Sequence, residues 1–181
     1  MPLPKTQAYT IDYIDTLPEG QRAELIDGVI YDMAPPSRIH QKISGELYTI
    51  INNHIKVKKG ACEVYNAPFA VFLDEDDKTY VEPDISVICD KNKLTDRGCN
   101  GAPDFIIEIV SLSSRKMDYS KKNALYSETG VREYWIVDPE NEQTTVYRYE
   151  EDDAPMIFSF DQSITVGIYG DLKINIAELL R

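Results

Sequence analysis

Two carboxylates stand inside stretches that otherwise consist of strand-forming, apolar residues. Glu108 lies in "DFIIEIV" (104–110) and Asp84 lies in "EPDISVI" (82–88). A buried carboxylate is costly unless it is paired or binds a metal ion. Two of them on neighbouring strands would repel each other by roughly 4 kcal/mol at ~4 Å and an effective dielectric near 20. A divalent cation removes this repulsion, and oxygen ligands with some positions left to water suit Mg²⁺ or Mn²⁺ rather than Zn²⁺.

The segment after Glu108 carries a lysine at a useful spacing. Asp118, Lys122 and Tyr126 recur every four residues, so they share one face of an expected helix. If this helix folds back over the end of the strand, Lys122 points into the same site as the two carboxylates. Two carboxylates, a metal ion and an ammonium can hydrolyse phosphodiesters. The metal ion lowers the pKa of a bound water, and the lysine orients that water or offsets charge on the phosphorane.

Each of these residues also has an interpretation without catalysis. A glutamate in an edge strand simply faces water, Asp84 after Pro83 can merely begin a strand, and a lysine on a helix is most often solvated. The two histidines, His40 and His54, lack the spacing of a zinc motif. His54 fits the polar face of a helix. His40, near the start of that helix, fits a site residue or a capping or surface role.

The elements that position these residues can be predicted from apolar periodicity and turn signals. Their order indicates a mixed α/β fold and not a regular βαβ alternation. The expected elements are a short helix at 9–18, a hairpin around Asp27-Gly28, an amphipathic helix at 37–60 closed by Gly60, strands at 62–74, 80–89 and 104–114, a helix at 117–130, a strand at 132–139, and two or three antiparallel strands with a last helical turn from 144 to 180, with an acidic loop at 74–78 and a hairpin tip at 150–153.

Length and composition favour one globular domain. The chain has 181 residues, of which 43% are hydrophobic, so we expect a single domain over 1–181. No stretch approaches the length that crosses a bilayer, and the N-terminus lacks the pattern of a signal peptide. The three cysteines form no CxxC pair, so we expect reduced thiols in a cytoplasmic protein.

The charge balance opposes non-specific nucleic-acid binding. The formal net charge is −12, whereas affinity for polyphosphates comes mainly from Lys and Arg. One local stretch is basic and lies beside the expected site, so its side chains are candidate phosphate contacts: Arg115, Lys116 and Lys121. In a dimer, two copies of this stretch can line one groove that holds a nucleic acid. Alternatively, a partner protein can bind DNA and bring it to the site.

The residues quoted so far resemble a known superfamily. "PD" at 83–84, "EIV" at 108–110 and a lysine in the next helix are similar to the PD-(D/E)XK nuclease pattern. The usual lysine stands two residues after the glutamate, where this chain has Val110. Migration of the lysine to the following helix, here to Lys122, is a recognised variant of that pattern.

A narrower resemblance covers nearly the whole chain. It rests on "ELIDG" (24–28), "EPDISVI" (82–88), "EIVSLSS" (108–114), "DYSKKNALYSETGVREYWIVDP" (118–139) and "GDLKINIAELL" (170–180). These stretches resemble the Uma-two family, a large bacterial family of proteins classed as restriction endonucleases. The most specific part is D-x-x-x-K-x-x-x-Y followed by G-V-x-E-Y-W-I-V-D-P.

The resemblance implies a fold and a set of site residues. The fold is a restriction-endonuclease-like core, with a central mixed β-sheet flanked by helices and additional antiparallel strands. The implied catalytic residues are Asp84, Glu108, Lys122 and Glu24. The implied ligands of Mg²⁺ or Mn²⁺ are the carboxylates of Asp84 and Glu108 and the main-chain carbonyl of Ile109. Strand parity fits this, because Glu108 shares a face with Ile106 and Val110.

The function that follows is a metal-dependent endonuclease that cuts phosphodiester bonds, in DNA by expectation, as a homodimer. The alternative is a non-catalytic binding or regulatory module that keeps the nuclease fold. Intact Asp84, Glu108 and Lys122 argue against that alternative. A third possibility is hydrolysis of another phosphoester, since the sequence does not separate DNA from RNA or from small phosphorylated substrates.

Overall fold

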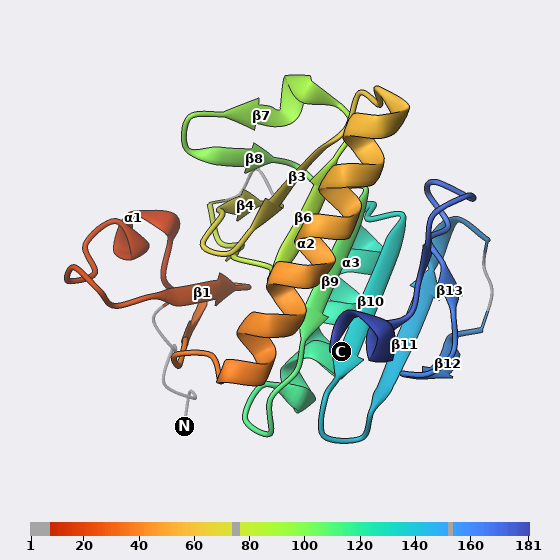
Figure 1. The fold of residues 1–181 in the computed structure, drawn as a ribbon. Helices are drawn as coiled ribbons and strands as arrows, with labels where there is room; N and C mark the ends of the chain where they lie inside the picture. Colours follow the sequence, from red (N-terminus) through yellow and green to blue (C-terminus); the bar gives the residue numbers. More distant parts are fainter. Residues whose placement is uncertain (1–7, 74–76, 152–153) are drawn as a thin grey trace.

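A central mixed sheet forms the middle layer of the computed structural model, which describes residues 8–73, 77–151 and 154–181 (Figure 1). Its strands follow the order β12-β11-β10-β9-β6-β3. Strands β9 and β10 are parallel, and the other neighbours are antiparallel. The bounds are β3 (Glu63–Asn66), β6 (Ile85–Ile88), β9 (Phe105–Ile109), β10 (Glu133–Asp138), β11 (Gln143–Arg148) and β12 (Met156–Ser159).

Helices cover both faces of the central sheet (Figure 1). The long helix α2 (Arg38–Lys58) packs its apolar face against one side, where Ile107 and Ile109 of β9 are buried. On the opposite side, Ile106 and Val110 pack with residues of α3 (Asn123–Thr129). The alternating parity predicted for the strand around Glu108 is therefore confirmed, and so is the central mixed sheet flanked by helices.

A second six-stranded sheet lies beside the central one and shares a core with it. Its order is β2-β1-β5-β4-β8-β7. The single strands predicted at 62–74 and 80–89 are wrong, because each is divided between the two sheets. Pro68 and Pro83 fall at the divisions, and proline has no N–H for a ladder. The bounds are β1 (Ala23–Ile26), β2 (Val29–Asp32), β4 (Val71–Phe72), β5 (Tyr80–Val81), β7 (Leu94–Thr95) and β8 (Gly98–Asn100).

The predicted hairpin and helices are present, with local differences. Asp27 and Gly28 have positive φ angles of 52° and 76° and connect β1 to β2. The left-handed residue that ends α2 is Lys59, not Gly60. The helix expected at 117–130 begins with a π-helical turn, η2 (Met117–Lys122), and continues as α3.

Short elements complete the chain. The C-terminal part adds the β13–β14 pair and a last helical turn, as expected, although it contains more strands than predicted. The acidic loop predicted at 74–78 and the hairpin tip predicted at 150–153 lie partly outside the described residues. In the described part of the chain, no helix is long and apolar enough to span a membrane. The bounds are α1 (Ile11–Ile14), η1 (Lys91–Lys93), η3 (Tyr149–Glu151), β13 (Ile164–Thr165), β14 (Lys173–Ile174) and α4 (Ile176–Leu179).

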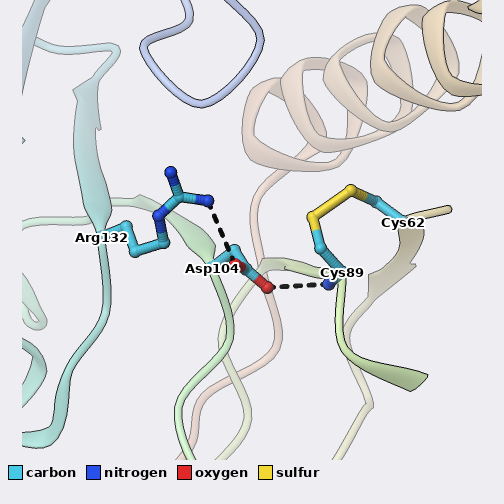
Figure 2. Close-up of a disulfide and its surroundings, with 4 residues drawn as sticks. All are labelled: Cys62, Cys89, Asp104 and Arg132. Atoms are coloured by element: carbon cyan, nitrogen blue, oxygen red, sulfur yellow. Dashed lines mark hydrogen bonds and ion pairs between the residues drawn. A yellow bond between two sulfur atoms is a disulfide. The ribbon is translucent and has the colours of Figure 1, made fainter. Parts of the chain in front are cut away.

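The expectation of three reduced thiols is wrong for two cysteines. Cys62 and Cys89 form a disulfide between the beginning of β3 and the end of β6 (Figure 2). The register explains the pairing, since Glu63 lies opposite Ile88 and the next residues outward are the two cysteines. Asp104 accepts a 2.7 Å hydrogen bond from the Cys89 main-chain N–H. Cys99 is a free, buried thiol.

Candidate active site

One cleft of about 740 Å³ brings the sequence-predicted residues together. Its wall includes all four predicted catalytic residues and the main chain around Ile109. The cleft lies where β6 begins and β9 ends, because these strands are antiparallel and Ile85 is paired with Ile107. The first turn of α2, the loop between β9 and η2 and the segment from β2 to α2 also line the cleft. The four residues are Glu24, Asp84, Glu108 and Lys122.

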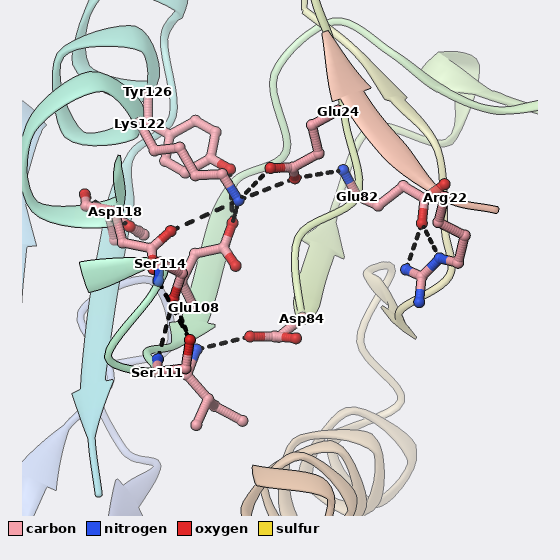
Figure 3. A network of polar contacts seen from close by, with 12 residues as sticks. Arg22, Glu24, Glu82, Asp84, Glu108, Ser111, Ser114, Asp118, Lys122 and Tyr126 are labelled. Atoms are coloured by element: carbon pink, nitrogen blue, oxygen red, sulfur yellow. Dashed lines mark hydrogen bonds and ion pairs between the residues drawn. The ribbon is translucent and has the colours of Figure 1, made fainter. Parts of the chain in front are cut away.

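Asp84 is fixed on one of its two carboxylate oxygens. It immediately precedes β6, and its Oδ2 accepts a 2.7 Å hydrogen bond from the main-chain N–H of Ile109 on the neighbouring strand (Figure 3). The Nε2 atom of His40 lies 3.1 Å from the same oxygen. The antiparallel pairing of β6 with β9 thus places Asp84 beside the end of the strand that carries Glu108.

Lys122 is buried at the centre of a carboxylate cluster (Figure 3). Its ammonium lies 2.8 Å from Glu108 Oε1 and 2.8 Å from Glu24 Oε2. Asp118, one helical turn earlier, lies 3.7 Å away. Glu24 also accepts a 3.0 Å hydrogen bond from the main-chain N–H of Glu82, which links β1 to the segment before β6. An ammonium has three N–H donors, and three carboxylates surround this one.

The cluster carries more negative than positive charge. Burial raises the pKa of Glu108 well above its ordinary value, although Lys122 opposes that shift. Burial likewise raises the pKa of Asp118 to about 6. For Lys122, burial lowers the pKa, but the nearby charges of Glu108, Glu24 and Asp118 outweigh burial and raise it overall. Three buried carboxylates against one ammonium form a site that favours an additional cation or proton.

Three site residues were not among the predicted catalytic set. The hydroxyl of Tyr126 donates a 2.9 Å hydrogen bond to Glu108 Oε1. Asp118 and Tyr126 share the four-residue spacing with Lys122, and that spacing was the signal for their place in the site. His40 was left between a site role and a surface role. It lines the cleft and contacts Asp84, and its alignment with Asp84 depends on the packing of α2.

The candidate phosphate contacts differ in position. Arg115 lines the cleft, but its guanidinium contacts Asp138 and Glu140, at 2.6 Å and 2.9 Å. Lys116 is exposed, and Lys121 donates a hydrogen bond to the Tyr31 hydroxyl. Neither lysine is part of the cleft wall. Arg22 also lines the cleft, where it forms an ion pair with Glu82.

The donor set fits a hard divalent cation held partly by water. Within the described residues, no three His, Cys, Asp or Glu side chains form a ready metal cage. Mg²⁺ is usually bound by one or two carboxylates together with waters and substrate phosphates, so a complete protein cage is not required. Asp84, directly before β6, and Glu108, on the adjacent strand β9, supply two carboxylates, and the surplus negative charge of the cluster favours a cation. The chemistry of the site therefore fits Mg²⁺ or Mn²⁺.

Comparison with known proteins defines the class of fold. A solved protein from Anabaena variabilis, described as "a putative nuclease belonging to DUF820", superposes with a TM-score of 0.77. The two sequences are 24% identical, and the match covers 94% of this chain and 96% of the other. The mixed sheet with helices on both faces is therefore a restriction-endonuclease-like fold, the class that the sequence predicted.

The family follows from the sequence match. The Uma2 family, described as "Putative restriction endonuclease", matches residues 10–168, and the chain belongs to this family. "Uncharacterized protein slr1290" from Synechocystis is 27% identical over 146 residues, which are 80% of this chain and 75% of that protein. The Uma-two resemblance is thus confirmed.

Proposed function

We propose that this chain is an endonuclease that hydrolyses phosphodiester bonds with Mg²⁺ or Mn²⁺ as its cofactor. The proposal rests mainly on the arrangement of Asp84, Glu108 and Lys122, which line one cleft where β6 begins and its antiparallel neighbour β9 ends. The family description and the nuclease description of the Anabaena protein support the same class of reaction.

We assign each residue a role that its contacts support. Asp84, Glu108 and the carbonyl of Ile109 would hold the cation, which lowers the pKa of a bound water and offsets phosphate charge. Lys122 keeps its charge at neutral pH and stabilises negative charge that develops on the phosphorane. Glu24 holds Lys122 through two close contacts, and it would set the position of the ammonium.

DNA is the proposed substrate, and the charge of the chain sets the conditions. With a net charge of −12, binding should be weak at physiological salt and should weaken further as salt rises. Both arginines of the cleft wall are already paired with carboxylates. A homodimer would place two clefts on one duplex, which is the arrangement that a two-fold substrate favours.

A plasmid-nicking assay tests the proposal. The wild type should nick supercoiled DNA at low salt with Mn²⁺ or Mg²⁺. Asp84→Asn and Glu108→Gln should abolish nicking, because each removes the charge of a metal ligand. Lys122→Ala should keep most of the metal affinity and lose on the order of 10²–10³ in rate, the usual cost of a lost charge-stabilising donor. Lys122→Arg should restore little, because a planar guanidinium replaces a compact ammonium poorly.

The control is Lys91→Ala, which removes an exposed lysine paired with Glu63 outside the cleft wall. It should nick like the wild type. Equal residual nicking by the wild type and Asp84→Asn would identify a contaminating nuclease. In that case, salt-sensitive DNA binding without cleavage would favour the alternative of a non-catalytic module.

A further inference from the structure

His40 lies in the first turn of α2 and contacts the Asp84 carboxylate. Ser37 caps this helix, and its Oγ accepts a 3.3 Å hydrogen bond from the main-chain N–H of His40. The imidazole then reaches over the start of β6, where Nε2 lies 3.1 Å from Asp84 Oδ2. The His40 side chain is only 15% exposed, so the contact is largely shielded from water.

The two carboxylate oxygens of Asp84 differ in their contacts. Oδ2 has two close contacts: it accepts a 2.7 Å hydrogen bond from the Ile109 N–H, and the Nε2 atom of His40 lies 3.1 Å from it. Oδ1 has no hydrogen-bond partner anywhere in the part of the chain that the structure describes. A carboxylate held in this way offers one oxygen, and not both, to a ligand in the cleft.

We propose that His40 is a positioning residue, which holds Asp84 so that Oδ1 alone binds the cation. The proposal rests on the proposed function, because it takes a divalent cation as the ligand of Asp84. Mg²⁺ and Mn²⁺ accept single carboxylate oxygens in octahedral geometry, whereas Ca²⁺ readily takes both oxygens of a carboxylate. The His40 contact therefore favours the smaller ions and disfavours Ca²⁺.

The same helix supplies a matched control. His54 also places its Nε2 near an aspartate, 3.3 Å from Asp171 Oδ1, and its ring packs at 4.9 Å on Tyr169. Neither His54 nor Asp171 is part of the cleft wall. A substitution at His54 therefore removes a similar histidine–aspartate pair from α2 and leaves the cleft unchanged.

The test measures Mn²⁺ and Ca²⁺ affinity by titration calorimetry. His40→Leu should weaken Mn²⁺ binding by about 10- to 100-fold, the usual effect of removing a residue that orients a metal ligand. Ca²⁺ affinity should fall less, so the preference for Mn²⁺ should narrow. His40→Gln should recover most of the Mn²⁺ affinity, because its amide N–H can still reach Oδ2. His54→Leu should bind like the wild type.

His40→Asn keeps the inference testable if His40→Leu does not fold. The shorter amide is polar but cannot reach Asp84, so it should bind Mn²⁺ as poorly as the leucine variant. Equal Mn²⁺ affinity in the wild type and in a folded variant without the contact, including no binding by either, overturns the inference. So does a directly bound imidazole nitrogen in the electron spin echo spectrum of the Mn²⁺ complex, because His40 would then be a ligand itself.

The outcomes separate this inference from the proposed function. If the wild type binds Mn²⁺ in a His40-dependent way but cleaves no nucleic acid, the nuclease proposal fails and the positioning role stands. If the wild type nicks DNA but His40→Leu binds Mn²⁺ and Ca²⁺ unchanged, the nuclease proposal stands and the positioning role fails.

Discussion

Removal of the buried lysine should destabilise the metal-free protein in a pH-dependent way. Lys122→Met keeps most of the side-chain volume but leaves Glu24, Glu108 and Asp118 without their shared counter-ion. Breaking a buried ion pair by removing one partner typically costs about 3–5 kcal/mol, because the remaining charge is uncompensated. We expect a loss in this range at pH 7.5 with a chelator present.

The sign of the pH dependence follows from the raised carboxyl pKa values. In the wild type, the pKa of Asp118 rises from its ordinary value of 3.8 to about 6. A raised pKa in the folded state contributes stability that is complete below the unfolded pKa and is lost as pH rises through the folded pKa. For Asp118 this amounts to about 3 kcal/mol between pH 4 and pH 6, at 1.36 kcal/mol per pKa unit. Without Lys122 both Asp118 and Glu108 should stay protonated to higher pH.

Urea unfolding at pH 5 and pH 7.5, each with a chelator, measures the effect. The loss in Lys122→Met should be smaller at pH 5 than at pH 7.5, because the orphaned carboxyls are protonated there. Lys116→Met is the control, since Lys116 is exposed on the same segment, and it should change stability by less than about 0.5 kcal/mol. A variant as stable as the wild type at pH 7.5 would refute the argument that Lys122 holds the cluster together.

Four further outcomes can be measured on the same protein. Alkylation of the denatured, unreduced chain should modify Cys99 alone, and reduction of Cys62–Cys89 should lower the unfolding free energy by roughly 2–4 kcal/mol, because the bond closes a loop across a separation of 27 residues. Light scattering at micromolar concentration should give twice the monomer mass, and a monomer would count against the homodimer. With the Cys62–Cys89 bond either intact or reduced, residues 1–181 should unfold in one transition, because the two sheets share a core and we propose a single domain. Two separate transitions would argue for two domains.

The parts of the fold that were predictable have local causes. The Asp27-Gly28 turn, the long amphipathic helix and the alternation around Glu108 are encoded in short stretches, and the structure contains all three. The grouping of Asp118, Lys122 and Tyr126 followed in the same way from their spacing. Even the π-helical turn of η2 preserves it, since all three side chains meet at Glu108 or Lys122.

The parts that were not predictable depend on contacts between distant segments. Strands β4, β5 and β7 have two residues each, too few for an alternating pattern to appear. The Cys62–Cys89 bond depends on the register of β3 against β6, which no local signal fixes. The contact of His40 with Asp84 joins two residues that are 44 positions apart, and it exists only because α2 packs across the central sheet. The sequence left the role of His40 open because that role depends on how α2 packs against the central sheet.

The distribution of charge around the cleft bears on how a nucleic acid would be held. Arg22 is committed to Glu82, and Arg115 is committed to Asp138 and Glu140. Lys122 is buried and enclosed by carboxylates, so its positive charge is balanced within the site and is not available on the protein surface. The described wall of the cleft thus offers little cationic charge that is not already paired, which agrees with the net charge of −12. We infer that binding energy for a polyanion would come mainly from the proposed divalent cation at Asp84 and Glu108 and from a second copy or a partner protein. Consequently, removal of the divalent cation should reduce the nicking rate more than the substitution of any one surface lysine.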